Sequence, residues 1–224
     1  MNLLKPRSPL TGNFNVINLR KISAIQTSNQ WNKALHIGLP NEFNQIETIF
    51  HWKCLETGFE WYTPAEAAGN SFLYQQLQRF PWYYMHDKWE FHTALDYIQA
   101  SEKVLEVGIG GAAFLQLARK KGADVEGMEI NPEAIQNAQR LGFTVYPFSI
   151  DEFLDQYPNQ KYDAICSFQV IEHVPDPILF LSKLVNILKL GGKLILSVPN
   201  SEVLRRVDPH YENLLDQPPH HMSH

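Results

Sequence analysis

The chain has 224 residues, of which 44% are hydrophobic and 19% are charged, and its formal net charge is −5. This length suits one α/β domain with a small additional region. No stretch approaches the ~20 apolar residues of a membrane-spanning helix, and the N-terminus lacks the apolar run of a secretory signal. Two cysteines make no disulfide framework. We therefore expect a cytoplasmic protein with no membrane partner. Because Lys and Arg are scattered, we also expect a small-molecule ligand and no nucleic acid; the composition indicates no oligomeric state.

Residues 1–70 are predicted to form a small N-terminal subdomain. Ser8–Gly12 and Cys54–Gly58 share the spacing of two zinc knuckles, C-x-x-C-G. Three of the four ligand positions hold Ser8, Thr11 and Thr57, and neutral hydroxyls are poor zinc ligands beside thiolates. We therefore expect a degenerate, zinc-ribbon-like hairpin without metal; a chance similarity of two turns is the alternative.

Residues 71–100 are predicted to be helical and to cap the open end of the sheet that follows. Tyr74, Tyr84, Trp89 and Phe91 belong to an aromatic-rich face in this segment. Ordinary packing against the core is the alternative to direct contact with a ligand.

Residues 101–224 carry short β-branched runs that alternate with helical patterns. The expected strands are Lys103–Val107, Asp124–Glu129, Phe143–Pro147, Tyr162–Phe168 and, after a turn at Gly191 and Gly192, Lys193–Val198. The expected helices are Ala112–Lys121, Pro132–Leu141, a short one within Ile150–Gln156, and Pro177–Lys189. This alternation predicts an α/β fold with a doubly wound parallel sheet.

The loop after the first of these strands is rich in glycine. Gly108 and Gly110, with Ala113, satisfy the dinucleotide pattern G-x-G-x-x-G/A, so the loop alone does not identify its ligand. Glu106 would repel a pyrophosphate but attract a ligand that carries an ammonium and a sulfonium. Glu129, at the end of the next strand, is placed to accept hydrogen bonds from ribose hydroxyls with either ligand.

Five motifs in the expected order resemble those of class I S-adenosyl-methionine-dependent methyltransferases. They are Val104–Gly111, Gly127–Glu129, Lys161–Ile165, Val170–Pro177 and Leu190–Leu194. The stretch from Ile171 to Pro177 is similar to the L-E-H-V-x-D-P signature of the branch that contains ubiquinone-biosynthesis O-methyltransferases and sugar-modifying methyltransferases. The resemblance covers roughly residues 100–200 and implies a Rossmann-like core with S-adenosyl-methionine as cofactor. Many relatives have a glycine where Ala112 stands.

The resemblance also implies which residues bind the cofactor. Glu106, Gly108 and Gly110 would hold its methionine end, and Glu129 its ribose. Ile130 would line the adenine slot, Ile150 and Asp151 would flank the adenine, and Phe168 and Gln169 would touch the cofactor at the end of the fourth strand.

Three histidines are the candidates for a catalytic base. His173 follows the fourth strand, and an orienting role for its loop is the alternative. His220 and His221 belong to a P-P-H-H stretch that resembles one bordering the acceptor pocket of some relatives. Adjacent histidines also ligate zinc, but the sequence shows no third and fourth ligand, so we assign no metal.

The resemblance implies methyl transfer to an oxygen or nitrogen of a small molecule, such as a sugar, a quinone-like compound or another secondary metabolite. Two alternatives stay open, a dinucleotide-dependent oxidoreductase and a non-catalytic cofactor-binding protein. Relatives complete a seven-stranded sheet, whereas this sequence offers five strands before it stops at His224. We therefore expect a core that lacks its last strands through truncation; the alternative is that residues 200–224 replace the missing edge irregularly.

Overall fold

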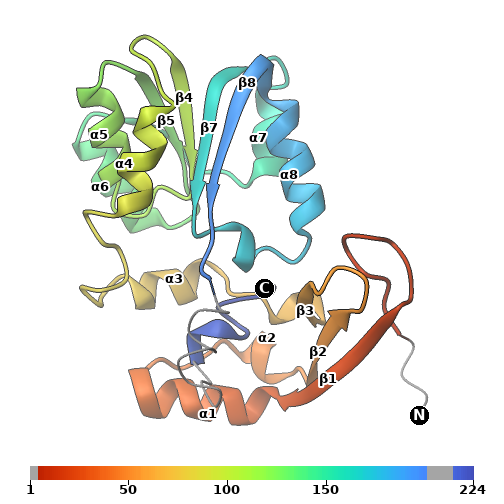
Figure 1. Ribbon diagram of the computed structural model, residues 1–224. Coiled ribbons are helices and arrows are strands. Elements are labelled where there is room, and N and C mark those ends of the chain that lie inside the picture. Colours follow the sequence, from red (N-terminus) through yellow and green to blue (C-terminus); the bar gives the residue numbers. More distant parts are fainter. Residues whose placement is uncertain (1–4, 201–213) are drawn as a thin grey trace. The chain divides into compact units, whose positions relative to one another are not determined.

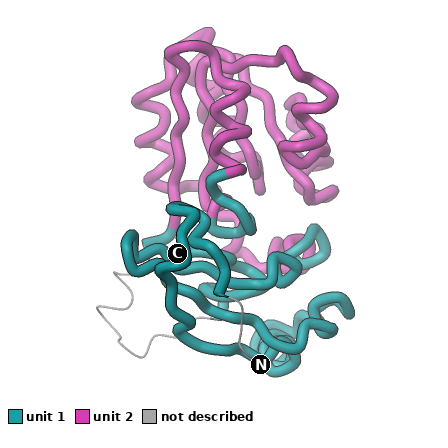
Figure 2. Tube along the Cα trace, turned by 90° about the vertical axis from the view of Figure 1, so that its right-hand side faces the viewer, with its two compact units in different colours: residues 1–73, 172–178, 199–224 teal, residues 74–171, 179–198 magenta. Residues whose placement is uncertain are grey.

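The computed structural model describes residues 5–200 and 214–224 (Figure 1). The chain forms two compact units, and Figure 2 colours them separately. Unit 1 contains residues 1–73, 172–178 and 199–224, and unit 2 contains residues 74–171 and 179–198. The sequence-based division placed all of residues 101–224 in one domain. In the structure, residues 172–178 and 199–224 belong to the same compact unit as residues 1–73. No helix in the described part of the chain is long and apolar enough to cross a membrane.

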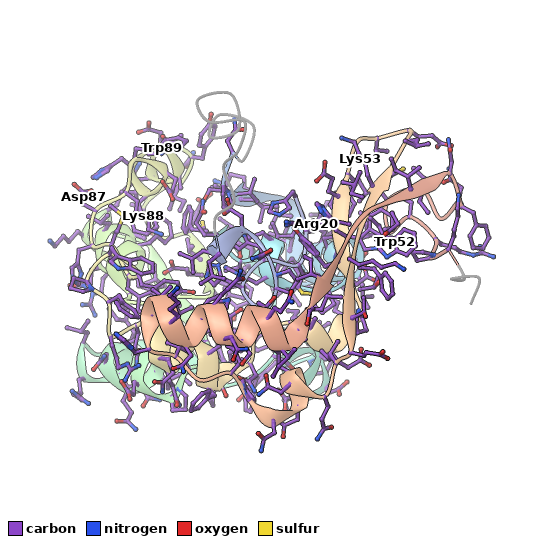
Figure 3. The ribbon with its side chains drawn as sticks, turned by 90° about the horizontal axis from the view of Figure 1, so that it is seen from below. Arg20, Trp52, Lys53, Asp87, Lys88 and Trp89 are labelled. Carbon is purple, nitrogen blue, oxygen red and sulfur yellow. The ribbon has the colours of Figure 1, made fainter. Side chains whose placement is uncertain are left out.

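Unit 1 is built on a three-stranded antiparallel sheet in the order β1-β2-β3. The strands are β1 (Val16–Ser23), β2 (Thr48–Cys54) and β3 (Glu60–Thr63). Its core contains Val16, Trp52, Cys54 and Trp61, all less than 5% exposed. Trp52 pairs with Trp61 in the register of β2 and β3, and its indole Nε1 donates a 2.9 Å hydrogen bond to Thr63. Figure 3 labels Arg20 on β1 and Trp52 and Lys53 on the neighbouring strand β2.

Two helices of unit 1 lie between β1 and β2 in the sequence, and two 3₁₀ turns follow β3. They are α1 (Ala24–Leu35), α2 (Asn41–Asn44) and the 3₁₀ turns η1 (Ala65–Ala67) and η3 (Leu214–Asp216). Ser23 caps α1 by accepting a hydrogen bond from the Gln26 amide. His36 ends the helix in the left-handed conformation, and Trp31 is fully buried on its inner face.

The described C-terminal residues pair with β3. The amide of Tyr62 donates to the carbonyl of Met222, and Glu60 and His224 exchange two backbone hydrogen bonds of 3.1 and 2.8 Å. This pairing is antiparallel, with a bridge between Trp61 and Ser223. The sequence showed no strand pattern beyond Asn200, because three residues are too few to produce a recognisable alternation.

The four knuckle positions meet in unit 1. Thr11 Oγ1 lies 3.9 Å from Cys54 Sγ, and Ser8 and Thr57 also make side-chain hydrogen bonds to this sulfur. These hydrogen bonds, chiefly those from Ser8 and Thr57, lower the pKa of the Cys54 thiol to about 6. The likeness to a zinc ribbon stays a prediction.

Unit 2 confirms the predicted doubly wound α/β fold. Its parallel sheet has the order β6-β5-β4-β7-β8. The strands are β4 (Lys103–Val107), β5 (Asp124–Met128), β6 (Thr144–Tyr146), β7 (Tyr162–Phe168) and β8 (Leu188–Ser197). The helices are α4 (Trp89–Asp96), α5 (Ala113–Lys120), α6 (Pro132–Arg140), α7 (Ile150–Gln156) and α8 (Pro177–Asn186). In Figure 1, α4, α5 and α6 lie on one face of the sheet, and α7 and α8 on the other.

Two regions, residues 71–100 and residues 177–198, differ most from the sequence prediction. Residues 71–100 form two helices, α3 (Ser71–Leu77) and α4, because Pro81 lies between them and cannot continue a helix. The strand β8 begins at Leu188, before the glycine pair that was expected to precede it as a turn. Gly191 instead lies within β8 at φ +77°, where the pairing with β7 shifts register.

Candidate cofactor and catalytic sites

Glu106 is a buried carboxylate at the carboxyl end of β4. Its side chain is 2% exposed, and its Oε2 atom has no hydrogen-bond partner among the described residues. Burial, and next the charge of Glu129, raise the pKa of Glu106 well above its usual range, while Lys88 opposes the rise. Lys88 precedes α4, between Asp87 and Trp89 (Figure 3). A buried acceptor without a donor is a site for a cationic or hydrogen-bonding ligand.

The glycine loop after β4 leaves no room for side chains. Gly108 has φ +79°, and a Cβ there would come within 2.5 Å of Val170 Cγ2. Gly110 has φ +47°, and its Cβ would lie 2.9 Å from the ring of Tyr84. Glycine is required at both positions by conformation and by space, which leaves backbone atoms to face a ligand.

Glu129 holds this loop from the end of β5. Its Oε2 accepts a 3.1 Å hydrogen bond from the Gly110 amide, and its Oε1 accepts from the amides of Ile130 and Asn131 at 2.8 and 2.9 Å. A carboxylate offers about four acceptor positions, and three are taken by these amides. Glu129 therefore orders the loop, with about one position left for a ribose hydroxyl. Burial raises the pKa of Glu129, and the hydrogen bonds from the three amides lower it by less, so the pKa lies above its usual range.

A contact to the loop that the sequence did not specify comes from residues 78–88. The Tyr84 ring lies against Gly110, and Asn131 Nδ2 donates to Tyr84 Oη at 3.4 Å and to Gln78 Oε1 at 2.8 Å. Burial raises the pKa of Tyr84, so its hydroxyl stays protonated. The aromatic density of the segment was the only signal in the sequence, and it did not single out Tyr84.

The other five predicted cofactor residues have different surroundings. Ile130 is 46% exposed, Ile150 is buried at the start of α7, and Asp151 forms an ion pair with Lys183. Phe168 packs edge-on against Phe91 and Phe114 within the core, so its ring is committed to packing. Gln169 has φ +57°, an unfavourable conformation for a residue other than glycine, and its backbone amide donates to Ser197 O at 2.9 Å.

The three candidate catalytic histidines lie together in unit 1. The ring centroid of His173 lies 4.5 Å from that of His220 and 5.0 Å from that of His221. The ring centroids of His220 and His221 lie 4.6 Å apart. The amides of Met222 and Ser223 both donate to Glu172 O, which holds this part of the tail beside His173. The sequence placed two of these histidines side by side but gave no reason to join the third to them.

Each of these imidazoles has its Nδ1 atom next to an oxygen. His173 Nδ1 hydrogen-bonds to His220 O, and His220 Nδ1 lies 2.9 Å from Leu215 O. Because a carbonyl only accepts, both Nδ1 atoms carry the proton and both Nε2 atoms carry the lone pair. Burial, and next the neighbouring imidazole of His173, lower the pKa of His220 to about 3. Burial and then His220 also lower the pKa of His221, so both rings are neutral near pH 7.

Comparison with known proteins finds similarity to methyltransferases. A family model described as a methyltransferase domain matches residues 78–223. Curated relatives include the ubiquinone biosynthesis O-methyltransferases of Photorhabdus laumondii, 30% identical over 105 residues, and of Xanthomonas oryzae, 32% identical over 116 residues. These matches cover 44% and 47% of this chain and 43% and 48% of the relatives, so the chain spans about half of their length. A solved S-adenosyl-methionine-dependent methyltransferase from Archaeoglobus fulgidus is 21% identical to this chain and has a TM-score of 0.47. The match covers 65% of this chain and 67% of the solved chain.

The family model matches more than half of the chain. The chain therefore belongs to the methyltransferase-domain family, with the core of a class I S-adenosyl-methionine-dependent methyltransferase. This membership removes the ground for the alternative of a dinucleotide-dependent oxidoreductase, which rested on the glycine pattern alone.

Proposed function

We propose that this chain transfers the methyl group of S-adenosyl-methionine to an oxygen or nitrogen atom of a small molecule. The observation that carries the proposal is the buried Glu106 carboxylate beside the glycine loop, one oxygen of which has no hydrogen-bond donor in the described part of the chain. A buried charge of this kind is costly unless a cation or donor meets it. The ammonium group at the methionine end of the cofactor is both a cation and a hydrogen-bond donor.

When bound, S-adenosyl-methionine supplies a methyl group that its sulfonium already activates for displacement. The chain's own residues therefore have to bind, orient and exclude water. Glu106 would hold the cationic end, Gly108 and Gly110 would let the backbone approach, and Glu129 would accept a ribose hydroxyl. Ile130, Ile150, Asp151, Phe168 and Gln169 are proposed around the adenine and the strand ends, with Phe168 limited by its packing in the core.

A hydroxyl acceptor has to lose its proton, and we assign that step to the histidines. The Nδ1 proton of His173 is held by His220 O, which leaves Nε2 as the basic atom. His220 and His221 lie against His173 and would help to position it. The named activity of the curated relatives, O-methylation, favours an oxygen acceptor here too.

Calorimetry with S-adenosyl-homocysteine, and separately with NAD, tests the cofactor. We expect binding of S-adenosyl-homocysteine that is weakened in Glu106→Gln, and no binding of NAD. Binding of NAD alone would overturn the proposal. A panel of phenols, sugars and amines with S-adenosyl-methionine then tests transfer, and turnover of none of them alongside tight cofactor binding would favour a non-catalytic cofactor-binding protein.

A further inference from the structure

The three clustered histidines have a geometry that suits a metal ion. One ring nitrogen from each of His173, His220 and His221 lies within 4.8 Å of one from each of the others. Two imidazole nitrogens on one tetrahedral zinc are about 3.4 Å apart, given Zn–N bonds of about 2.0–2.1 Å. The rings would therefore have to close by at most about 1.4 Å, which side-chain rotation can supply.

The atoms around the cluster match those that surround metal-bound histidines. Such histidines usually donate the proton of their second ring nitrogen to a carbonyl or a carboxylate, which fixes the ring and its tautomer. His173 Nδ1 meets His220 O, His220 Nδ1 meets Leu215 O at 2.9 Å, and His221 Nδ1 lies 3.5 Å from Asp216 Oδ1. Two of the three rings thus have this hydrogen bond in place, and the Asp216 carboxylate lies near the third.

A carboxylate offers a fourth ligand. Glu172 is 4% exposed, and its Oε1 lies 3.9 Å from His173 Nε2, close to the spacing of two ligands on one ion. The other neighbours of the cluster include further aromatic rings and the tail backbone, and the centroid of the His224 ring lies 5.9 Å from that of His221. The ring of buried Trp31 is centred 6.5 Å from that of His220, and two amides of the tail hold Glu172 O.

We propose that His173, His220 and His221, with Glu172 as a further ligand, bind a divalent transition-metal ion of the zinc class. Imidazole and carboxylate ligands suit zinc, cobalt and nickel, whereas a magnesium or calcium site would be built from oxygen atoms. The site lies within unit 1 and needs neither cofactor nor acceptor. A bound ion would occupy the Nε2 lone pair that the base role of His173 requires, so the base role belongs to the metal-free chain and is blocked in the metal-bound one.

Zinc and cobalt titrations of the full chain, with any affinity tag removed and metal stripped by a chelator, test the inference. We expect one equivalent of Zn²⁺ by calorimetry, and Co²⁺ absorption bands typical of nitrogen and oxygen ligands. A thiolate-to-cobalt charge-transfer band would place the ion at Cys54 and overturn the proposal. The absence of stoichiometric binding of either ion would overturn it as well.

Three variants locate the site. His173→Gln and His221→Gln should lose stoichiometric binding, and Asp216→Asn, which keeps every proposed ligand, should weaken it about 10–100-fold. His36→Asn is the matched control, because His36 is an exposed histidine of unit 1 whose left-handed conformation asparagine tolerates. Circular dichroism checks that each variant is folded. Zinc binding unchanged in both ligand variants would contradict the assignment.

The outcome is distinguishable from that of the proposed function. If S-adenosyl-homocysteine does not bind but zinc does, the methyltransferase proposal fails and the metal site stands. If the cofactor binds but zinc does not, the metal site fails and His173 keeps its assignment as the base.

Discussion

The backbone amide of Gly110 donates a 3.1 Å hydrogen bond to Glu129 Oε2, and this bond joins the loop after β4 to the end of β5. Replacing Glu129 with alanine removes the acceptor for this amide and for those of Ile130 and Asn131. Because buried amides without acceptors are costly, we expect Glu129→Ala to lower the free energy of unfolding by about 1–3 kcal/mol. We expect a loss of similar size, about 1–3 kcal/mol, in binding of S-adenosyl-homocysteine.

Denaturant unfolding and calorimetry measure the two losses for Glu129→Ala. Glu126→Ala serves as a control from the same strand, because Glu126 bonds to Tyr146 and Tyr162 rather than to the loop. It should leave cofactor affinity unchanged. Full affinity in Glu129→Ala would show that Glu129 has no part in the cofactor site.

Glu106 makes cofactor binding depend on pH. Its pKa is raised well above the usual range by burial and by Glu129, so in the ligand-free protein this carboxyl stays protonated to higher pH than a free glutamic acid does. A cationic ammonium favours the carboxylate form and lowers this pKa. Binding therefore releases a proton, and affinity rises with pH until the pKa of the ligand-free protein is passed.

Calorimetry of S-adenosyl-homocysteine in two buffers of different ionisation enthalpy counts the released protons. Glu106→Gln should bind more weakly, release fewer protons and lose the rise of affinity with pH. If proton release is the same in this variant, a group other than Glu106 meets the cation.

Gly108 is required by space as well as by conformation. Its φ of +79° costs an alanine about 1–2 kcal/mol, and contact of the new Cβ with Val170 adds an overpacking cost of about 1–3 kcal/mol. Gly191 has nearly the same φ, +77°, with no atom within 4 Å of a Cβ. We therefore expect Gly108→Ala to destabilise unit 2 more than Gly191→Ala does.

Thermal unfolding of the two alanine variants separates conformation from contact. Adding Val170→Ala to Gly108→Ala should recover part of the difference, because it removes the methyl group that would lie 2.5 Å from the alanine Cβ. Equal losses at Gly108 and Gly191 would mean that Val170 moves away freely.

The sequence predicted the elements whose signals are local. The bounds of β4 and β7 were predicted to the residue, since each is a short apolar run in a parallel sheet. The short helix expected within Ile150–Gln156 is α7, and in the structure a Ser149–Glu152 capping box begins it. Glu106 and Glu129 were located for the same reason, because each lies at the end of a predicted strand.

The features that the sequence did not specify depend on distant parts of the chain. The pairing of Met222–His224 with β3 joins residues about 160 positions apart, and three residues carry no strand pattern. His173 reaches His220 across 47 positions. Tyr84 meets Gly110 only because the chain turns after Pro81, a geometry that aromatic density does not specify.

Cys54 should make the stability of unit 1 depend on pH. Hydrogen bonds from Ser8 and Thr57 lower its folded pKa from 9.0 to about 6. Between these values the folded thiol is ionised and the unfolded one is protonated, so the unfolded state binds more protons and stability rises with pH. The stabilisation is fully present above the unfolded pKa near 9 and is lost as pH falls through the folded pKa near 6.

Denaturant unfolding at pH values from 6 to 8 measures this dependence, and Cys54→Ser should flatten it because a serine hydroxyl does not ionise there. Cys166→Ser is the matched control. Burial raises the pKa of Cys166 well above its usual range, so its thiol stays protonated in the folded chain and contributes no rise of stability with pH. If the rise persists in Cys54→Ser, the Cys54 thiol is not ionised and the hydroxyls of Ser8 and Thr57 do not act on it as a thiolate.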